Sequence, residues 1–284
     1  MDICGKRGYV PIPRLVNSIP LVDMKKYLKI YQRLLSMNVS MLLAYTGNFM
    51  NSVFASLLWC AFSFASILLL TSRSPDVFGW SRDELMLLTA MYSVVVGFVH
   101  VFITNNMFEM AHVIRFGRLD SILLKPMDSQ FMLSLKEVNY PTVPRVLTGC
   151  ILVVIFLFRL HISPTISDMG VLILLSCASI LFLYSFWFTV MVFTVYYPEL
   201  WNLIELLVHF SDIAKYPGEM YHGLGQFIVF LFPLTLIVTL PTKAVLRSLH
   251  WSDGIILVCF SIGFFLLSRI VWKHALRSYT SASS

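Results

Sequence analysis

The stretch NSVFASLLWCAFSFASILLLTS, residues 51–72, decides the fold, because it holds no charged residue over the length of a lipid bilayer. A hydrocarbon core of roughly 30 Å takes about 20 residues of helix. No water reaches backbone groups there, so such a stretch must form a helix that satisfies its own hydrogen bonds. Similar stretches follow at about 85–106, 143–160, 169–196 and 253–272. The sequence therefore predicts an all-α integral membrane protein.

One more crossing is expected between residues 199 and 245, where two segments compete for it. The first, 199–215, has a helical pattern but contains three ionisable residues. The second, 223–245, is more apolar, but two prolines interrupt it, and proline kinks a helix. Either the second segment is a kinked span, or the first crosses and the second is a re-entrant hairpin. Both alternatives give six transmembrane helices and place both termini on one side of the membrane.

The composition fits a membrane fold and argues against nucleic-acid binding. Hydrophobic residues make up 58% of the 284 residues and charged residues 13%, against about 25% charged residues in a soluble domain. The net charge of +6 comes from Lys and Arg that flank apolar stretches. Such residues normally set membrane orientation, so nucleic acid is not expected as a partner. The five cysteines form no C-x-x-C pair and are interpreted as small buried hydrophobes.

The sequence contains no motif for catalysis or nucleotide binding. It has no G-x-x-x-x-G-K-[ST] phosphate loop, no H-E-x-x-H metal spacing and no G-x-S-x-G elbow. His100 is a lone ionisable residue within the 85–106 span, which is more typical of helix packing than of a proton relay. The chain is therefore not expected to be an enzyme or to hold a metal or cofactor itself.

The distribution of positive charge predicts the orientation. Residues 1–50 hold seven Lys and Arg, residues 107–142 hold four, and the C-terminal end holds three. The loop at 161–168 holds none. The positive-inside rule therefore places both termini and the 107–142 segment in the cytoplasm, with a prokaryotic plasma membrane as the expected location. Two positive residues on the predicted outer side oppose this and are outnumbered.

An amphipathic helix is expected before the first span, over residues 24–37. Lys and Arg occupy one face, and this helix is suited to lying among lipid head groups. The residues expected to lie at the membrane interface in this helix are Tyr27, Leu28, Tyr31, Arg33, Leu34 and Leu35. Residues 1–23 are expected to form an irregular cytosolic segment, residues 24–274 the transmembrane domain, and residues 275–284 a cytosolic tail.

Two sets of residues are candidates for a transport pathway, and each has a plainer alternative. The residues of the first set lie in or just before the first span and could equally pack helices together: they are Asn48, Asn51, Ser52, Trp59 and Phe62. The second set lies on one helical face, because its members are spaced by four and three residues. It could instead be the wet side of an interfacial helix, and it consists of Glu205, His209 and Asp212.

The run IRFGRLDSILLKP, residues 114–126, resembles the I-R-x-G-x-L-D-x-x-L-L-x-P stretch of ABC-2 type permeases. These permeases are the six-span membrane subunits of ATP-driven exporters of the type V kind. The proline-interrupted segment 217–247, on the predicted outer side, is also similar to that family. The matching positions are Ile114, Arg115, Gly117, Leu119, Asp120, Leu123, Leu124, Lys125 and Pro126.

The resemblance implies a permease subunit of an ABC exporter. A second permease, identical or related, would complete the pathway, and two copies of a separate cytosolic ABC ATPase would bind ATP and Mg²⁺. The 107–142 segment would couple the two. Within it, Gly117 permits a tight bend, Leu119, Ile122 and Leu123 could pack into a groove of the ATPase, and Asp120 could cap a helix or pair with a basic group.

The sequence also allows alternatives to an ABC exporter permease. The 114–126 run could be a connector on the membrane whose basic residues contact lipid phosphates. The whole chain could be an ATP-independent secondary transporter or a membrane assembly factor. Neither alternative would need an ATPase partner.

Overall fold

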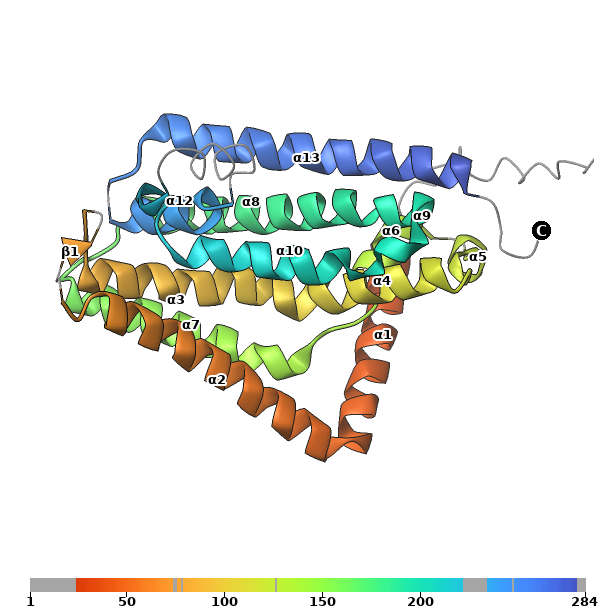
Figure 1. Ribbon diagram of the computed structural model, residues 1–284, viewed down its shortest axis with the longest axis horizontal. Coiled ribbons are helices and arrows are strands. Elements are labelled where there is room, and N and C mark those ends of the chain that lie inside the picture. Colours follow the sequence, from red (N-terminus) through yellow and green to blue (C-terminus); the bar gives the residue numbers. More distant parts are fainter. Residues whose placement is uncertain are drawn as a thin grey trace, which may run out of the picture.

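The computed structural model describes residues 24–73, 76–77, 79–125, 127–221, 234–246 and 248–279. This part of the chain is almost entirely helical (Figure 1). The one pair of strands within it is a short antiparallel hairpin, β1 (Asp76–Val77) and β2 (Trp80–Ser81). The α-helices are α1 (Met24–Ala44), α2 (Thr46–Leu70), α3 (Arg82–Val99), α4 (Asn105–Arg115), α5 (Leu119–Leu123), α6 (Ser129–Ser134), α7 (Val143–Arg159), α8 (Ile166–Met191), α9 (Phe193–Tyr196), α10 (Leu203–Ser211), α12 (Leu236–Val245) and α13 (Trp251–Ser278).

Five helical stretches among the described residues are long and apolar enough to cross a membrane, which confirms the predicted all-α membrane fold, whereas the predicted number of six spans stays a prediction. They are Thr46–Leu70, Arg82–Arg115, Tyr140–Arg159, Ile166–Tyr196 and Trp251–Ser278. The second of these joins α3 to α4 through a π-helix, His100–Thr104, without a break. It is the central element, with 78% of its most apolar window buried. Figure 1 shows α8 and α13 lying along the same direction as α3.

The segment from Trp201 to Glu219 follows the α3–α4 helix from end to end. At one end the Trp201 ring lies 5.0 Å from the guanidinium carbon of Arg115. At the other, the indole Nε1 of Trp80 donates a hydrogen bond to Glu219 at 3.2 Å. Helix α10 lies at the centre of this segment, but neither residues 199–215 nor the described part of the competing segment is among the five candidate spans, so both alternatives for this crossing stay predictions. The short helix α12 contains Pro241, and the first part of the competing segment, residues 223–233, lies outside the described residues.

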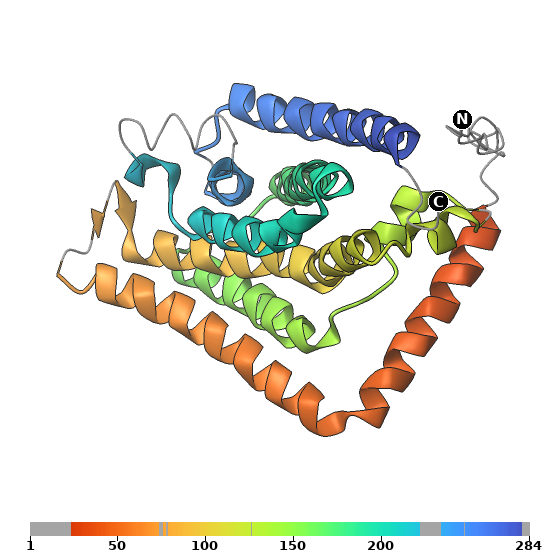
Figure 2. The same cartoon turned by 45° about the vertical axis from the view of Figure 1, so that its right-hand side comes forward.

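Helix α1 lies across the bundle, whereas α2 returns toward β1 (Figures 1 and 2). Helix α1 continues to Ala44, beyond the expected stretch of residues 24–37, because residues 38–44 contain no glycine or proline. The helix breaks at Tyr45, whose φ of −127° and ψ of 53° are not helical. The two helices therefore meet at a sharp elbow, and few residues of α1 touch the rest of the chain.

Small residues let α7 pack closely against α3. A Cβ atom on Gly149 of α7 would lie 3.1 Å from the backbone oxygen of Ala90 and 3.0 Å from the Cβ of Ser93. Close backbone approach at small residues is typical of helix pairs in membranes. This contact fixes the position of the helix that follows the 107–142 segment.

Candidate functional site

The turn between α4 and α5 is built as a helix C-terminal motif around Gly117. This residue has a φ of 64°, the left-handed conformation that glycine adopts most readily. The backbone N–H of Arg118 donates to the oxygen of Val113 at 2.8 Å, and that of Gly117 donates to the oxygen of Ile114 at 3.1 Å. This pair of bonds is the Schellman motif. We call residues 114–125 the α4–α5 turn.

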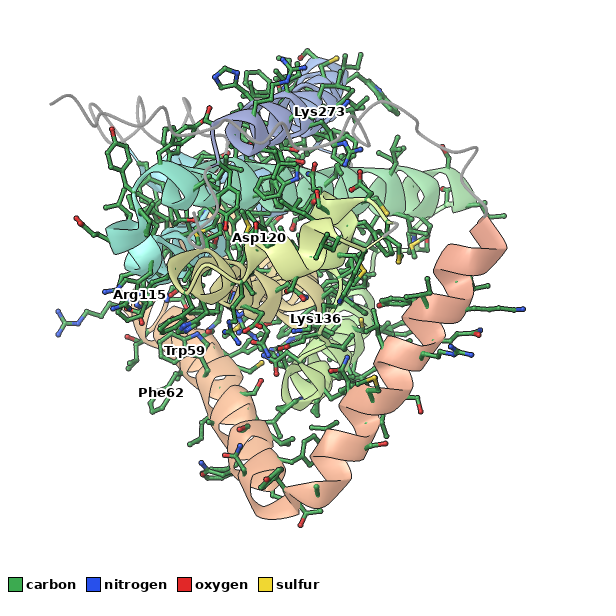
Figure 3. All side chains as sticks on the ribbon, turned by 90° about the vertical axis from the view of Figure 1, so that its right-hand side faces the viewer. Trp59, Phe62, Arg115, Asp120, Lys136 and Lys273 are labelled. Atoms are coloured by element: carbon green, nitrogen blue, oxygen red, sulfur yellow. The ribbon has the colours of Figure 1, made fainter. Side chains whose placement is uncertain are left out.

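The surface of the α4–α5 turn combines apolar and positively charged side chains. Leu124 is 86% exposed and Phe116 is 63% exposed. The guanidinium carbons of Arg115 and Arg118 lie 5.9 Å and 5.8 Å from the centre of the Phe116 ring. Lys125 is exposed as well. Figure 3 looks onto this end of the molecule, with Arg115 and Asp120 labelled. Such a surface suits an acidic partner that also offers an apolar contact.

Two residues predicted to enter a partner groove pack instead inside the chain. Leu119 is fully buried and Ile122 is 9% exposed, both within the chain's own hydrophobic core. Leu123 is half-buried against the same core. Leu119 and Ile122 are unavailable to a partner because the face of α5 that carries them packs against the rest of the bundle. Asp120 is half-buried and does not cap α5, whose preceding residue is Arg118. Pro126 lies outside the described residues.

A polar network joins the segment after this turn to α13. The two guanidinium nitrogens of Arg269 donate to the two carboxylate oxygens of Asp128 at 2.9 Å and 2.8 Å, and one also donates to Gln130 at 3.1 Å. The indole Nε1 of Trp272 donates to Ser129 at 3.0 Å. Asp128 itself caps α6 by accepting from the backbone N–H of Phe131. The sequence gives one signal of this network, because Asp128 precedes α6 as an N-cap residue typically does, but the pairing with α13 was not predicted.

The Asp128–Arg269 pair predicts a pH-dependent stability. Burial alone would raise the pKa of Asp128, but hydrogen bonds from Arg269 and from the Phe131 backbone outweigh it and hold that pKa below its usual value. The pair therefore stabilises the fold above the ordinary pKa of about 4, and this contribution is lost as the pH falls through the lowered value. We expect Arg269→Gln to lower the stability by about 1–2 kcal/mol at pH 7, because solvent partly screens the pair.

Thermal unfolding of the purified protein across pH 3–7 measures this difference. The gap between wild type and Arg269→Gln should be widest at neutral pH and should narrow as the pH falls toward the lowered pKa. A gap of the same size at every pH would show that Arg269 acts through packing alone.

The predicted pathway residues of α2 lie mostly on its exposed side. Trp59 is 49% exposed and Phe62 is 67% exposed (Figure 3). Asn48 and Asn51 are exposed too, and Ser52 is half-buried. Only 17% of the most apolar window of α2 is buried. This helix therefore presents a broad face to lipid or to another subunit.

The structure divides the predicted polar stripe of α10. Glu205 and His209 are exposed, whereas Asp212 turns inward and accepts a hydrogen bond from the Tyr92 hydroxyl at 2.5 Å. The Nδ1 atom of His209 lies 3.9 Å from the second oxygen of Asp212. Arg145, which was not among the predicted site residues, is 3% exposed, and its guanidinium carbon lies 5.4 Å from the centre of the Tyr92 ring. A buried charged cluster thus joins α3, α7 and the end of α10.

The expected interfacial helix shows mixed exposure along α1. Leu28 is 59% exposed and Arg33 is exposed, whereas Tyr31, Leu34 and Leu35 are half-buried. The Tyr27 side chain lies outside the described part of the chain. One turn further on, the buried Asn38 amide donates to the backbone oxygen of Lys136 at 3.1 Å. This bond ties α1 to the segment before α7.

A cavity of about 350 Å³ lies beside the α4–α5 turn, lined by Arg115, Pro198, Glu199 and Trp201. Within the described ranges, no three His, Cys, Asp or Glu side chains come close enough to hold a metal ion.

Comparison with known proteins identifies the family of this chain. A family model described as an ABC-2 family transporter protein matches residues 57–283, which is about four fifths of the chain. The matched region extends from the middle of α2 beyond α13 and includes the α4–α5 turn. No curated protein and no solved structure matches the chain.

Proposed function

Because this chain belongs to the ABC-2 family of transporter proteins, we propose that it is the permease subunit of an ATP-driven exporter. In this role it forms the wall of the substrate pathway and transmits movement from a separate cytosolic ATPase. Two permeases, identical or related, and two ATPase subunits make up the complete transporter. ATP and Mg²⁺ bind in the ATPase, and this chain carries out no chemistry of its own.

The observation that carries the proposal is the exposed surface of the α4–α5 turn. Leu124 and Phe116 present exposed apolar side chains at a helix end, and a partner subunit that covers this turn would bury them. Arg115, Arg118 and Lys125 surround them with positive charge. A partner with an acidic rim around an apolar groove would bury the first two and neutralise the other three.

The position of this turn suits the transmission of movement. It lies at the end of a helix that is continuous from Arg82 to Arg115 and runs through the core of the bundle. A displacement of the turn therefore acts on helix α4 rather than on a loop. The π-helix at His100–Thr104 interrupts the regular hydrogen bonding in this element, and π-helices are frequent at functional sites. We infer that α4 moves relative to α3 at this point when the ATPase subunits close.

The exposed ionisable residues of α10 support a pathway between two permease subunits. Glu205 and His209 are exposed in the single chain, and ionisable side chains in a membrane rarely face lipid. A water-filled space between two subunits would solvate them.

The positive residues gather toward the end with the α4–α5 turn, which favours a plasma-membrane orientation with this end and both termini in the cytoplasm. A prokaryotic origin remains part of the proposal.

Purification of the tagged chain from its native membrane tests this function. We expect an ATPase subunit with a Walker motif to co-purify, and its ATP hydrolysis in reconstituted vesicles to require Mg²⁺ and this chain. A stable, active preparation without any nucleotide-binding subunit would overturn the proposal. Ion-driven transport by the chain alone would then indicate a secondary transporter, and a lipid-linked activity without transport would indicate an assembly factor.

A further inference from the structure

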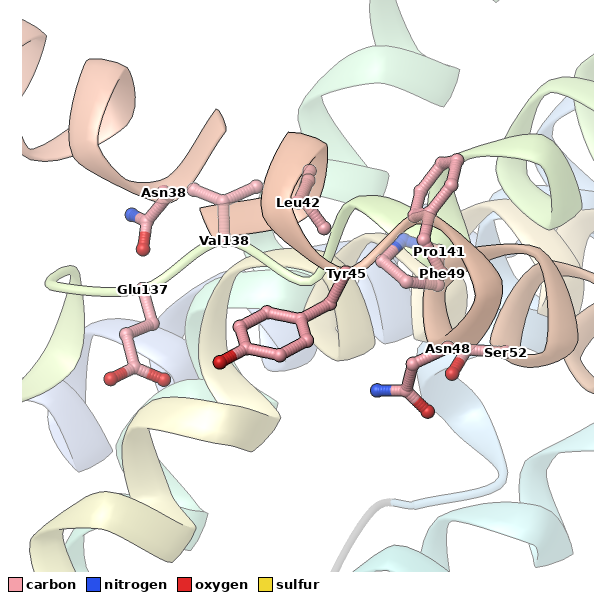
Figure 4. A pocket seen from close by; sticks show the side chains of 9 residues that line it. All are labelled: Asn38, Leu42, Tyr45, Asn48, Phe49, Ser52, Glu137, Val138 and Pro141. Carbon is pink, nitrogen blue, oxygen red and sulfur yellow. The ribbon is translucent and has the colours of Figure 1, made fainter. Parts of the chain in front are cut away.

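A pocket of about 230 Å³ lies at the elbow between α1 and α2 (Figure 4). Its walls come from the end of α1, the start of α2 and residues 137–141, which precede α7. It is separate from the α4–α5 turn, and nothing in the coupling proposal uses it. Two of the predicted pathway residues, Asn48 and Ser52, line it.

Hydrogen bonds fix the wall formed by residues 137–141. Asn106, which is 1% exposed, donates through its side-chain amide to the backbone oxygen of Glu137 at 2.7 Å and accepts from the backbone N–H of Glu137 at 2.9 Å. The backbone N–H of Asn139 donates to the oxygen of Val101 in the π-helix at 2.7 Å. The Asn38 amide, from α1, donates to the backbone oxygen of Lys136 at 3.1 Å. The fold therefore sets the position of Glu137.

The charges at this wall leave one negative charge in excess. The Nζ atom of Lys136 lies 3.3 Å from an oxygen of Glu109 and 3.5 Å from an oxygen of Glu137. Two carboxylates thus share one ammonium group. The side chain of Glu137 is 33% exposed, so a ligand in the pocket can reach it. A ligand group that balances this charge must be cationic.

The pocket has a polar side and an apolar side. In Figure 4 the Tyr45 hydroxyl points toward the Glu137 carboxylate, and the Asn48 amide lies along the same side. Leu42 and Phe49 close the opposite side. A ligand that fits this division carries a cation and hydrogen-bond acceptors at one end and hydrocarbon at the other.

The pocket lies at the depth expected for phospholipid head groups. The apolar span of α2 begins at Thr46, directly beside the pocket. The partly exposed charged residues Glu109, Lys136 and Glu137 mark where the bilayer core ends, because such side chains are not expected among lipid tails. A lipid is therefore the amphipathic molecule at highest local concentration.

We propose that this pocket binds a phospholipid whose head group carries a primary ammonium. The ammonium pairs with the Glu137 carboxylate, and the phosphate oxygens accept hydrogen bonds from the Tyr45 hydroxyl and the Asn48 amide. The acyl chains leave past Leu42 and Phe49 along α2. The proposal requires only that the chain lies in a membrane, so it stands or falls independently of the ATPase partner.

Native mass spectrometry of the delipidated protein tests this site. The probes are phosphatidylethanolamine, phosphatidylcholine and phosphatidylglycerol with identical acyl chains. We expect phosphatidylethanolamine to bind at least fivefold more tightly than the other two, because they lack a primary ammonium. Glu137→Gln should remove this preference. Asn48→Ala, a change at an exposed side chain, should weaken phosphatidylethanolamine binding without a risk to the fold.

Glu199→Gln is the matched control, because it removes an exposed carboxylate elsewhere at the same end of the molecule. It should leave the lipid preference unchanged. Equal losses in Glu137→Gln and Glu199→Gln, or tight binding of phosphatidylglycerol by the wild type, would overturn the proposal. Displacement of the lipid by glycerophosphoethanolamine at the same concentration would show that the pocket recognises a soluble amine instead, which also contradicts it.

Discussion

Replacement of Leu124 by aspartate is expected to abolish stable binding of the ATPase subunit while the chain stays folded in the membrane. Leu124 is 86% exposed, so few contacts within the chain are lost. An apolar residue at the centre of an interface contributes about 2 kcal/mol or more, and this loss corresponds to an affinity about 30-fold lower. Co-purification of the ATPase and its membrane-dependent ATP hydrolysis should both fall accordingly.

Ile166→Asp provides the matched control for this prediction. Ile166 is 91% exposed and lies at the start of α8, at the opposite end of the bundle. This variant should bind the ATPase as the wild type does. Equal retention of the ATPase by Leu124→Asp and the wild type would remove the α4–α5 turn from the interface. Equal loss in both variants would point to a general effect of the added charge.

Gly149→Val is expected to cause a large loss of stability. The new Cβ would lie 3.1 Å from the backbone oxygen of Ala90, and a backbone atom cannot move aside as a flexible side chain can. Helices α3 and α7 must therefore separate, and forced overpacking of this kind costs about 1–3 kcal/mol. The melting temperature of the purified protein should fall, and the yield of monodisperse protein should fall with it.

Gly170→Val is the corresponding control, because nothing lies within 4 Å of a Cβ atom built on Gly170 in α8. Valine has a higher helix propensity than glycine, so this variant should be as stable as the wild type or slightly more stable. A normal melting temperature for Gly149→Val would show that the close contact between α3 and α7 is not needed for the fold.

The sequence predicts the fold class well because bilayer spans carry a strong signal in composition alone. The stretch expected at 143–160 corresponds to α7, Val143–Arg159, almost residue for residue. The family resemblance based on residues 114–126 agrees with the family model that matches the chain. These features depend on residues close together in the sequence, where hydrophobicity and motif spacing can be seen directly.

The orientation of side chains within the α4–α5 turn is not predictable in the same way. Leu119 and Leu124 are both leucines of one motif, yet the first is buried in the chain's own core and the second is exposed to solvent. Their difference arises from the Gly117 turn, which places one face of α5 against the bundle. A motif gives the residue types but not the packing of the helix that carries them.

Contacts between segments that are distant in the chain could not be predicted from the sequence either. Arg145 lies at the start of a span, where a positive residue is expected to face the head groups, but it is buried beside Tyr92. The pairing of Asn106 with the backbone of Glu137 joins residues 31 positions apart. Neither residue type nor spacing indicates such contacts, because they depend on how the helices are arranged.

Site-specific photo-crosslinking tests directly whether a separate ATPase drives this chain through the α4–α5 turn. A photoreactive amino acid is placed at Leu124, and at Ile166 for comparison, in cells that express the complete transporter. We expect an adduct with the nucleotide-binding subunit from position 124 and none from position 166. An adduct from position 166, or none from position 124 in an active transporter, would contradict this expectation.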